Sequence, residues 1–186
     1  MRHFLYARHF LLLTAFAVLA GVLCWLHLTI EVSLSFALYG ALHASALALS
    51  LRVHHPVWRK FLFIVIAAAL SLMTVRAGIL ATQLSPTLAG NVGRHTVLGL
   101  VAAMGAVTYG IAIRAFGFYK LSAGLLATIA IGCMLAALLA LFTLGYVQFL
   151  GQSWLAIPWW YAFSAGLWYS DQPLRASTEP GGRGDY

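Results

Sequence analysis

The amino-acid sequence predicts an all-α protein: a polytopic transmembrane helical bundle of six spans with a cytoplasmic N-terminus. Three observations lead to this fold class. Apolar side chains make up 62% of the 186 residues and charged ones only 8%, whereas a soluble domain is about 45–50% apolar and about 25% charged. The apolar residues form runs close to the roughly 20 residues that a spanning helix needs. The basic residues stand mainly at the ends of these runs.

The first predicted span is Leu11–Ile30, which follows a basic start containing Arg2 and Arg8. A basic start before an apolar run is also the pattern of a secretory signal peptide. This run is longer than the apolar core of a typical signal, and the residue before Cys24 is Leu23, not the small residue of a lipoprotein cleavage site. We therefore interpret the run as an uncleaved first span.

Five more apolar runs follow, separated by short connections rich in basic or turn-forming residues. They predict further spans at Leu34–Leu51, Phe61–Leu84, His95–Phe116, Leu121–Phe142 and Trp154–Tyr169. The last run is short, contains Pro158 and is crowded with Trp and Tyr, which favour the headgroup level of a bilayer. We expect it to span; if Trp154–Tyr169 is interfacial instead, the bundle has five spans.

The distribution of basic residues predicts the orientation. With the N-terminus cytoplasmic and six alternating spans, the outer side holds only Arg94, while Arg76 lies inside the third span. The inner side holds Arg2, Arg8, Arg52, Arg59, Lys60, Arg114, Lys120, Arg175 and Arg183. An excess of Lys and Arg marks the cytoplasmic face. The pattern predicts a bacterial-type inner-membrane protein with both termini in the cytoplasm.

The domain organisation follows from the same runs. Residues 1–170 are expected to form a single transmembrane helical domain. Residues 171–186 are rich in Pro and Gly and poor in apolar side chains, so they predict a disordered cytoplasmic tail.

Rows of small residues predict where helices pack. Lipid gives helices no hydrophobic reason to associate, so close packing depends on small residues at every fourth position. The second run contains a row of Gly40, Ala44 and Ala48. The fifth run contains the longest row, which is Gly124, Thr128, Gly132, Ala136 and Ala140. We expect this longest row to form a buried helix–helix seam.

The candidate site surrounds Arg76, a charge inside an apolar run. A charge in the hydrocarbon core costs about 2.5–3.5 kcal/mol on insertion scales and is normally paired or faces a cavity. Glu31 lies on the same outer side, and His27, His43 and His95 bring imidazoles from neighbouring spans. These residues predict a polar pocket that serves as a ligand or ion pathway. The alternative is that Arg76 snorkels to the outer headgroups.

Three hypotheses for function follow. The leading one is a small transporter, or a membrane subunit of a larger complex, with a polar site around Arg76. The second is an electron-transfer subunit linked to b-type haem or quinone, in which His43 pairs with His27 or His95 as an axial ligand. The third is a non-catalytic membrane protein that binds a partner, as an assembly or immunity factor does.

The composition also excludes several classes. The net charge of +7 is spread in ones and twos rather than gathered in a patch, so no nucleic-acid partner is expected. No hydrolase or nucleotide-binding motif is present in the sequence, and we expect no catalytic residues, no metal and no cofactor other than the alternative haem b. The expected partners are the lipid bilayer and other membrane subunits or further copies of the chain.

Overall fold

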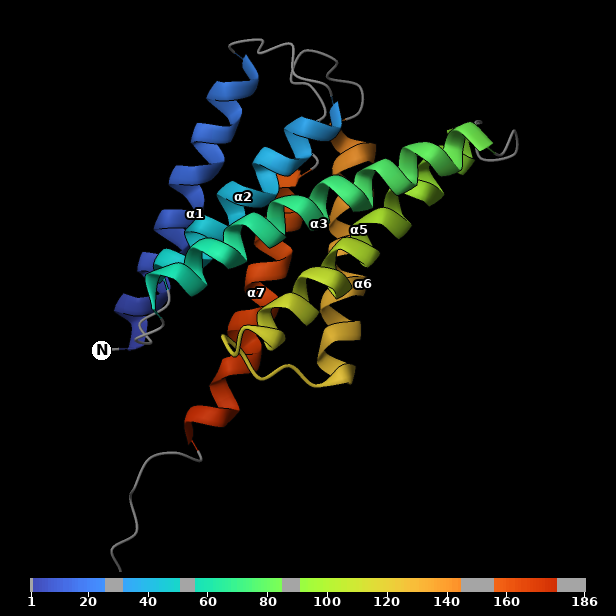
Figure 1. Cartoon of the computed structure of the whole chain (residues 1–186). Helices are drawn as coiled ribbons and strands as arrows, with labels where there is room; N and C mark the ends of the chain where they lie inside the picture. The colour runs from blue at the N-terminus through green and yellow to red at the C-terminus, as the bar shows by residue number, and fades with distance from the viewer. Residues whose placement is uncertain (1, 26–31, 51–55, 85–90, 145–155, 177–186) are drawn as a thin grey trace, which may run out of the picture.

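The computed structural model describes residues 2–25, 32–50, 56–84, 91–144 and 156–176, and every regular element in this part of the chain is an α-helix. The six helices are α1 (Arg2–Trp25), α2 (Val32–Ser50), α3 (Val57–Leu84), α5 (Asn91–Ala115), α6 (Ala123–Leu144) and α7 (Ala156–Ala176) (Figure 1). The all-α prediction is therefore confirmed.

Three of these helices are long and apolar enough to cross a membrane, judged by length and composition within the described residues. The qualifying segments are Val57–Ala81, His95–Ala115 and Ala123–Phe142, in α3, α5 and α6. Shorter apolar helical stretches cover Arg8–Leu23 and Leu34–Ser50. A chain with three such helices is suited to being embedded in a membrane.

The helices differ from the predicted runs mainly at their ends. α1 begins at Arg2 rather than Leu11, because its basic first residues continue the helix instead of preceding it. α3 begins directly after Pro56, whose carbonyl accepts hydrogen bonds from the amides of Arg59 and Lys60. Proline is favoured at this position because the first turn of a helix has no use for its missing amide.

The C-terminal helix also differs from the prediction. α7 continues to Ala176, past the domain boundary placed at residue 170. Pro158 lies in its first turn, where it leaves the helix intact. The rest of the predicted tail, 177–186, lies outside the described residues.

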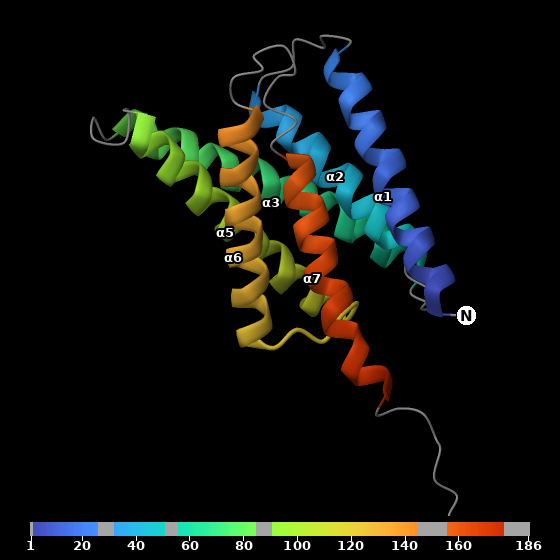
Figure 2. The same ribbon diagram turned by 180° about the vertical axis from the view of Figure 1, so that it is seen from behind.

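The helices pack mostly in sequence order. α2 packs against α3, α3 against α5, α5 against α6 and α6 against α7, while α1 lies at the edge beside α2. Figure 1 shows α3 and α5 side by side, running obliquely across α6 and α7. Seen from behind, α6 and α7 lie next to each other and α1 is at the far edge (Figure 2). The bundle thus brings α7 back against α1 and α2, the first helices of the chain.

The contact between α2 and α3 depends on the small residues predicted for it. Ala44 and Ala48 are buried, with 0% and 2% of their surface exposed. At Gly40, an added Cβ would overlap the side chain of Ser71 and lie 2.9 Å from the carbonyl oxygen of Ala67. A larger residue at position 40 would therefore push the two helices apart, as expected of a small-residue interface.

The turn between α5 and α6 has well-defined stop and start signals. Gly117 takes a left-handed conformation with φ of 71°, and the amide of Phe118 donates to the carbonyl of Ile113. This is the Schellman arrangement, which glycine adopts without steric cost. The Ser122 hydroxyl then accepts from the amide of Leu125 and caps the N-terminus of α6.

The long row of small residues in α6 does not form the predicted seam over its full length. Gly124 and Thr128 are exposed, and a Cβ added at Gly124 or Gly132 would meet nothing within 4 Å. Ala140 alone in the row is fully buried; Ala136 is half-buried. The spacing of small residues shows that a close approach is possible, but it does not identify the partner. α6 instead packs on α7 through the face that carries Ile129.

That face of α6 meets a glycine on the neighbouring helix. A Cβ added at Gly166 of α7 would collide with the side chain of Ile129. The buried residues of α6 on this side are Ile129, Ala130, Cys133, Ala137 and Ala140. The close approach of α6 and α7 therefore rests on the small residue of α7 rather than on the predicted row.

Candidate functional site

His43 lies at the centre of the described bundle. It is on α2, its side chain is fully buried, and its Nε2 forms a hydrogen bond of 3.3 Å with the hydroxyl of Ser164 on α7. Ser164 is itself 1% exposed. α2 and α7 are far apart in the sequence and meet at this hydrogen bond. The position of the imidazole therefore depends on the tertiary packing of the bundle.

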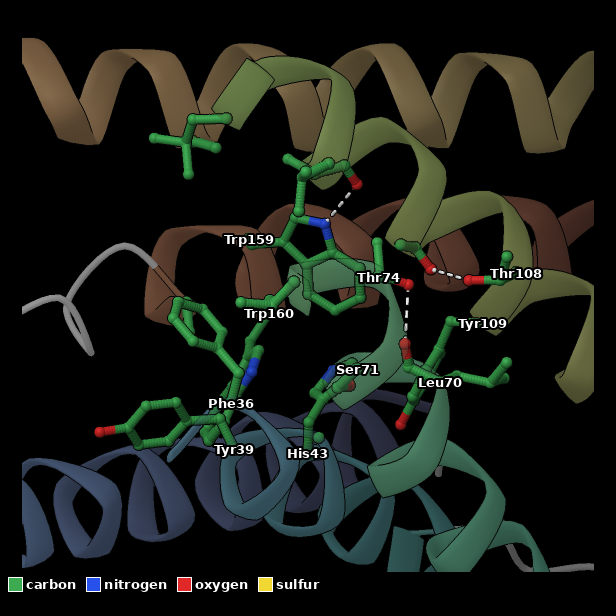
Figure 3. Close-up of a pocket in the computed structure, with 18 residues that line it drawn as sticks. Phe36, Tyr39, His43, Leu70, Ser71, Thr74, Thr108, Tyr109, Trp159 and Trp160 are labelled. Atoms are coloured by element: carbon green, nitrogen blue, oxygen red, sulfur yellow. Dashed lines mark hydrogen bonds between the residues drawn. The ribbon is translucent and has the colours of Figure 1, made fainter. Parts of the chain in front are cut away.

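Aromatic rings surround this imidazole. It stacks on Trp160 with centroids 5.5 Å apart, and it meets Trp159 and Phe163 edge-on at 5.6 and 5.8 Å. The ring of Tyr109, from α5, lies 5.2 Å away at an interplanar angle of 30°. Figure 3 shows His43, Tyr109, Trp159 and Trp160 converging from α2, α5 and α7.

A cavity of about 90 Å³ adjoins this cluster. Its walls come from α2, α3, α5 and α7, with one residue of α6. They are mainly apolar and aromatic, and none of the described side chains that line the cavity carries a formal charge. The polar side chains in the walls are Tyr39, His43, Ser71, Thr74, Thr108, Tyr109, Trp159 and Trp160.

Several of these polar groups are already committed to the helices. The Thr74 hydroxyl donates to the carbonyl of Leu70, and the Thr108 hydroxyl donates to that of Met104. The indole N–H of Trp159 donates to the carbonyl of Ala102 at 2.9 Å, which ties α7 to α5 (Figure 3). The threonine oxygens still have lone pairs that can accept a hydrogen bond.

Two buried polar atoms have no hydrogen-bond partner among the described residues. They are Nδ1 of His43 and the phenolic oxygen of Tyr109. Both residues line the same cavity. An unsatisfied buried polar group costs about 1–3 kcal/mol. Both atoms are enclosed by neighbouring side chains, although their residues line the cavity.

Comparison with known proteins gives no assignment. No family model, no curated protein and no solved structure matches this chain. The function is therefore argued from the geometry of the site alone.

The residues predicted around Arg76 are not gathered into one pocket in the described structure. Arg76 lies on α3 with its side chain exposed, and it does not line the cavity, although its neighbours Thr74 and Val75 do. His95, at the start of a candidate span, is half-buried and its ring lies 5.4 Å from that of Phe142 on α6. Glu31 and His27 lie outside the described residues.

Among the predicted site residues that the structure describes, which are Arg76, His43 and His95, His43 is the one that lines the cavity. Tyr109, Ser164 and Trp159 were not anticipated. The Trp-rich run Trp154–Tyr169 was expected to span, with an interfacial position as the alternative, and neither prediction placed Trp160 beside His43, where it is 2% exposed. A tyrosine in the middle of an apolar run is the sequence signal that could have pointed to Tyr109, because its hydroxyl needs a partner when buried.

Proposed function

We propose that the protein is a six-span membrane protein that transports a small uncharged solute by way of the cavity beside His43. The observation that carries this proposal is the cavity between the helices, whose described walls include His43 and Tyr109 and carry no formal charge. In this proposal the ligand pathway predicted around Arg76 runs instead past His43.

The six-span arrangement, with both termini cytoplasmic in a bacterial-type inner membrane, rests on charge. In Figure 1 the N-terminal ends of α1, α3 and α6 and the C-terminal ends of α5 and α7 lie toward the lower side of the bundle. The basic residues Arg8, Arg59, Lys60, Arg114 and Lys120 belong to these ends. Their common side supports the proposed orientation, since Lys and Arg gather on the cytoplasmic face.

The spanning of α7 is also supported by its packing. Trp160, Phe163, Ser164 and Leu167 are each at most 2% exposed, and they point into the bundle along successive turns of α7. A helix lying flat in the interface would bury one face in lipid instead. We therefore take α7 as the sixth span.

The chemistry of the walls favours an uncharged solute. Moving an unpaired ion from water into an apolar setting is far costlier than moving a neutral polar group. A buried opposite charge is the usual compensation, and none of the described lining side chains supplies one. Hydroxyl, imidazole and indole groups remain to select the solute by hydrogen bonds.

The volume favours a small solute over the rings of the electron-transfer hypothesis. Each water occupies about 30 Å³ in the liquid, and a dry cavity of about 150 Å³ binds benzene. A cavity of about 90 Å³ is smaller than that. The Nε2 of His43, which would bind a haem iron, is hydrogen-bonded to the hydroxyl of Ser164.

Flux into proteoliposomes tests the proposal. Light scattering measures the rate at which the liposomes swell in acetamide. Proteoliposomes that contain the protein should swell faster than protein-free liposomes. Gly105 lines the cavity, and a Cβ there meets only Trp159 and Thr74 at 3.8 and 3.9 Å. Gly105→Leu should therefore fill the cavity and return swelling to the protein-free rate.

The matched control is Gly124→Leu, at a position where an added Cβ meets nothing within 4 Å. It adds the same side chain on the outer face of α6. Proteoliposomes with this variant should swell as fast as those with the unmodified protein. Equal swelling with and without the unmodified protein would show that transport is the wrong function. An equal loss of swelling rate in Gly105→Leu and Gly124→Leu would show that the solute does not pass through the cavity.

A further inference from the structure

The acidic residues of the chain lie close to its two ends. They are Glu31, Asp171, Glu179 and Asp185, so residues 32–170 contain neither Asp nor Glu. Cations in this stretch therefore have no acidic neighbour along the chain. Two short segments of it carry two cations each: the first turn of α3 has Arg59 and Lys60, and the end of α5 with the turn that follows has Arg114 and Lys120.

The fold brings these two segments together. The ring of Phe63 on α3 lies 5.6 Å from that of Phe116 and 5.0 Å from that of Phe118, both in the turn after α5. Arg59 and Lys60 lie one helical turn before Phe63, on the same side of α3. Arg114 and Lys120 flank the two phenylalanines of the turn in sequence. Four cations that are spread along the sequence are thus gathered around one aromatic contact.

The charged groups of this cluster are open to a ligand. The side chains of Arg114 and Lys120 are exposed, and those of Arg59 and Lys60 are half-buried. The guanidinium of Arg114 donates to the carbonyl of Leu121 at 3.4 Å, which uses one of its five N–H donors. The guanidinium of Arg59 lies over the ring of Trp58, 5.6 Å from its centre. Both groups therefore keep N–H donors of the kind that bind phosphate.

An exposed apolar stripe begins beside the cations. Trp58, Phe61 and Val65 are 61%, 67% and 47% exposed, and they follow one face of α3 at helical spacing. This helix is long and apolar enough to cross a membrane, so acyl chains can lie along the stripe. Trp at its start favours the headgroup level. A ligand that suits both the cations and the stripe has an anionic head and an acyl tail.

We propose that this edge of the bundle binds an anionic phospholipid, with its phosphate among the four cations and an acyl chain along α3. Lys and Arg close to a membrane surface each strengthen the binding of anionic lipid by about fivefold, equivalent to about 1 kcal/mol. A free phosphate ion would use the cations but leave the apolar stripe uncovered, so the lipid is the better match. The proposal does not depend on transport.

Retention of lipid from a defined mixture tests the proposal. The full chain is equilibrated in detergent with equal amounts of phosphatidylglycerol and phosphatidylcholine that have the same acyl chains. It is then purified again, and the bound lipids are counted by mass spectrometry. Both lipids have the phosphate and the tails, but only phosphatidylglycerol has a net negative charge. We expect at least about fivefold more phosphatidylglycerol to be retained; equal retention would overturn the proposal.

The two ends of α5 supply matched variants. Arg114→Gln removes a charge from the proposed site, and Arg94→Gln removes one near the other end of the same helix, about 30 Å away at about 1.5 Å per residue. Arg114→Gln should lower the preference for phosphatidylglycerol by about threefold to fivefold, whereas Arg94→Gln should leave it unchanged. Equal losses in these two variants would indicate a general attraction of charge and overturn the site.

Arg59→Gln tests the cluster from α3, without touching the contact between Arg114 and Leu121. It should lower the preference as much as Arg114→Gln does, and an unchanged preference would remove α3 from the site. A wash with sodium phosphate, compared with sodium chloride at equal ionic strength, should leave the retained lipid unchanged. Displacement by phosphate alone would show a site for a free anion instead. These results are independent of acetamide flux, so lipid binding and transport are tested separately.

Discussion

His43 and Tyr109 lie ring to ring, 5.2 Å apart, although one comes from α2 and the other from α5, and each keeps one buried polar atom without a partner among the described residues. Each unpaired buried polar atom costs about 1–3 kcal/mol. The contact of these two rings is the relationship from which the proposed site is built.

Removing the Tyr109 hydroxyl should not weaken the empty protein. Tyr109→Phe keeps the ring contacts with His43 and Phe163 and deletes a group whose desolvation costs about 1–3 kcal/mol when unpaired. We expect the free energy of unfolding, measured in detergent without solute, to stay equal or rise by about 1 kcal/mol. A fall of more than about 1 kcal/mol would mean that the hydroxyl is bonded in the empty protein.

Two glycine substitutions should have opposite effects on stability. Gly40→Ala places a Cβ against Ser71 and the Ala67 carbonyl, so it should lower the free energy of unfolding by about 1–3 kcal/mol. Gly124→Ala meets no neighbour and should be neutral or raise it by up to about 1 kcal/mol. Unfolding midpoints in detergent measure both, and equal effects would contradict the packing of α2 on α3.

Arg76→Leu should leave acetamide flux unchanged. The Arg76 side chain is exposed on α3 and does not line the cavity. Removing a charge from an apolar run also lowers the cost of insertion. Loss of flux in a variant that still folds would return the functional site to Arg76, as the sequence first indicated.

The orientation can be read from the two ends of α3. Val57 is 82% exposed at one end and Gln83 is exposed at the other. In a background with Cys24 and Cys133 replaced by Ala, Val57→Cys should react with an impermeant maleimide only in inside-out vesicles. Gln83→Cys should react only in right-side-out vesicles. The reverse pattern would contradict the cytoplasmic N-terminus.

The helical class was predictable from sequence because length, apolar runs and turn residues are local properties. The small residues of α2 correctly predicted a close contact, since Gly40 has a helix directly against it. The same pattern in α6 failed as a full seam because periodicity identifies a face but not its partner. Gly124 lies on the outer side of the single chain.

The site was less predictable for the same reason. Arg76 drew attention because a lone charge in an apolar run is costly, whereas its exposure on α3 depends on how the helices pack. The cavity requires the end of the described chain, at Trp159 and Ser164, to return beside His43. No pattern within one segment contains that contact, so only His43 of the site residues was anticipated at the cavity.

The most direct test of the central claim is an experimental structure of the protein soaked with acetamide. We predict density for acetamide in the cavity beside His43 and Tyr109. Density only for water at that position, or acetamide bound elsewhere with the cavity unchanged, would contradict the claim.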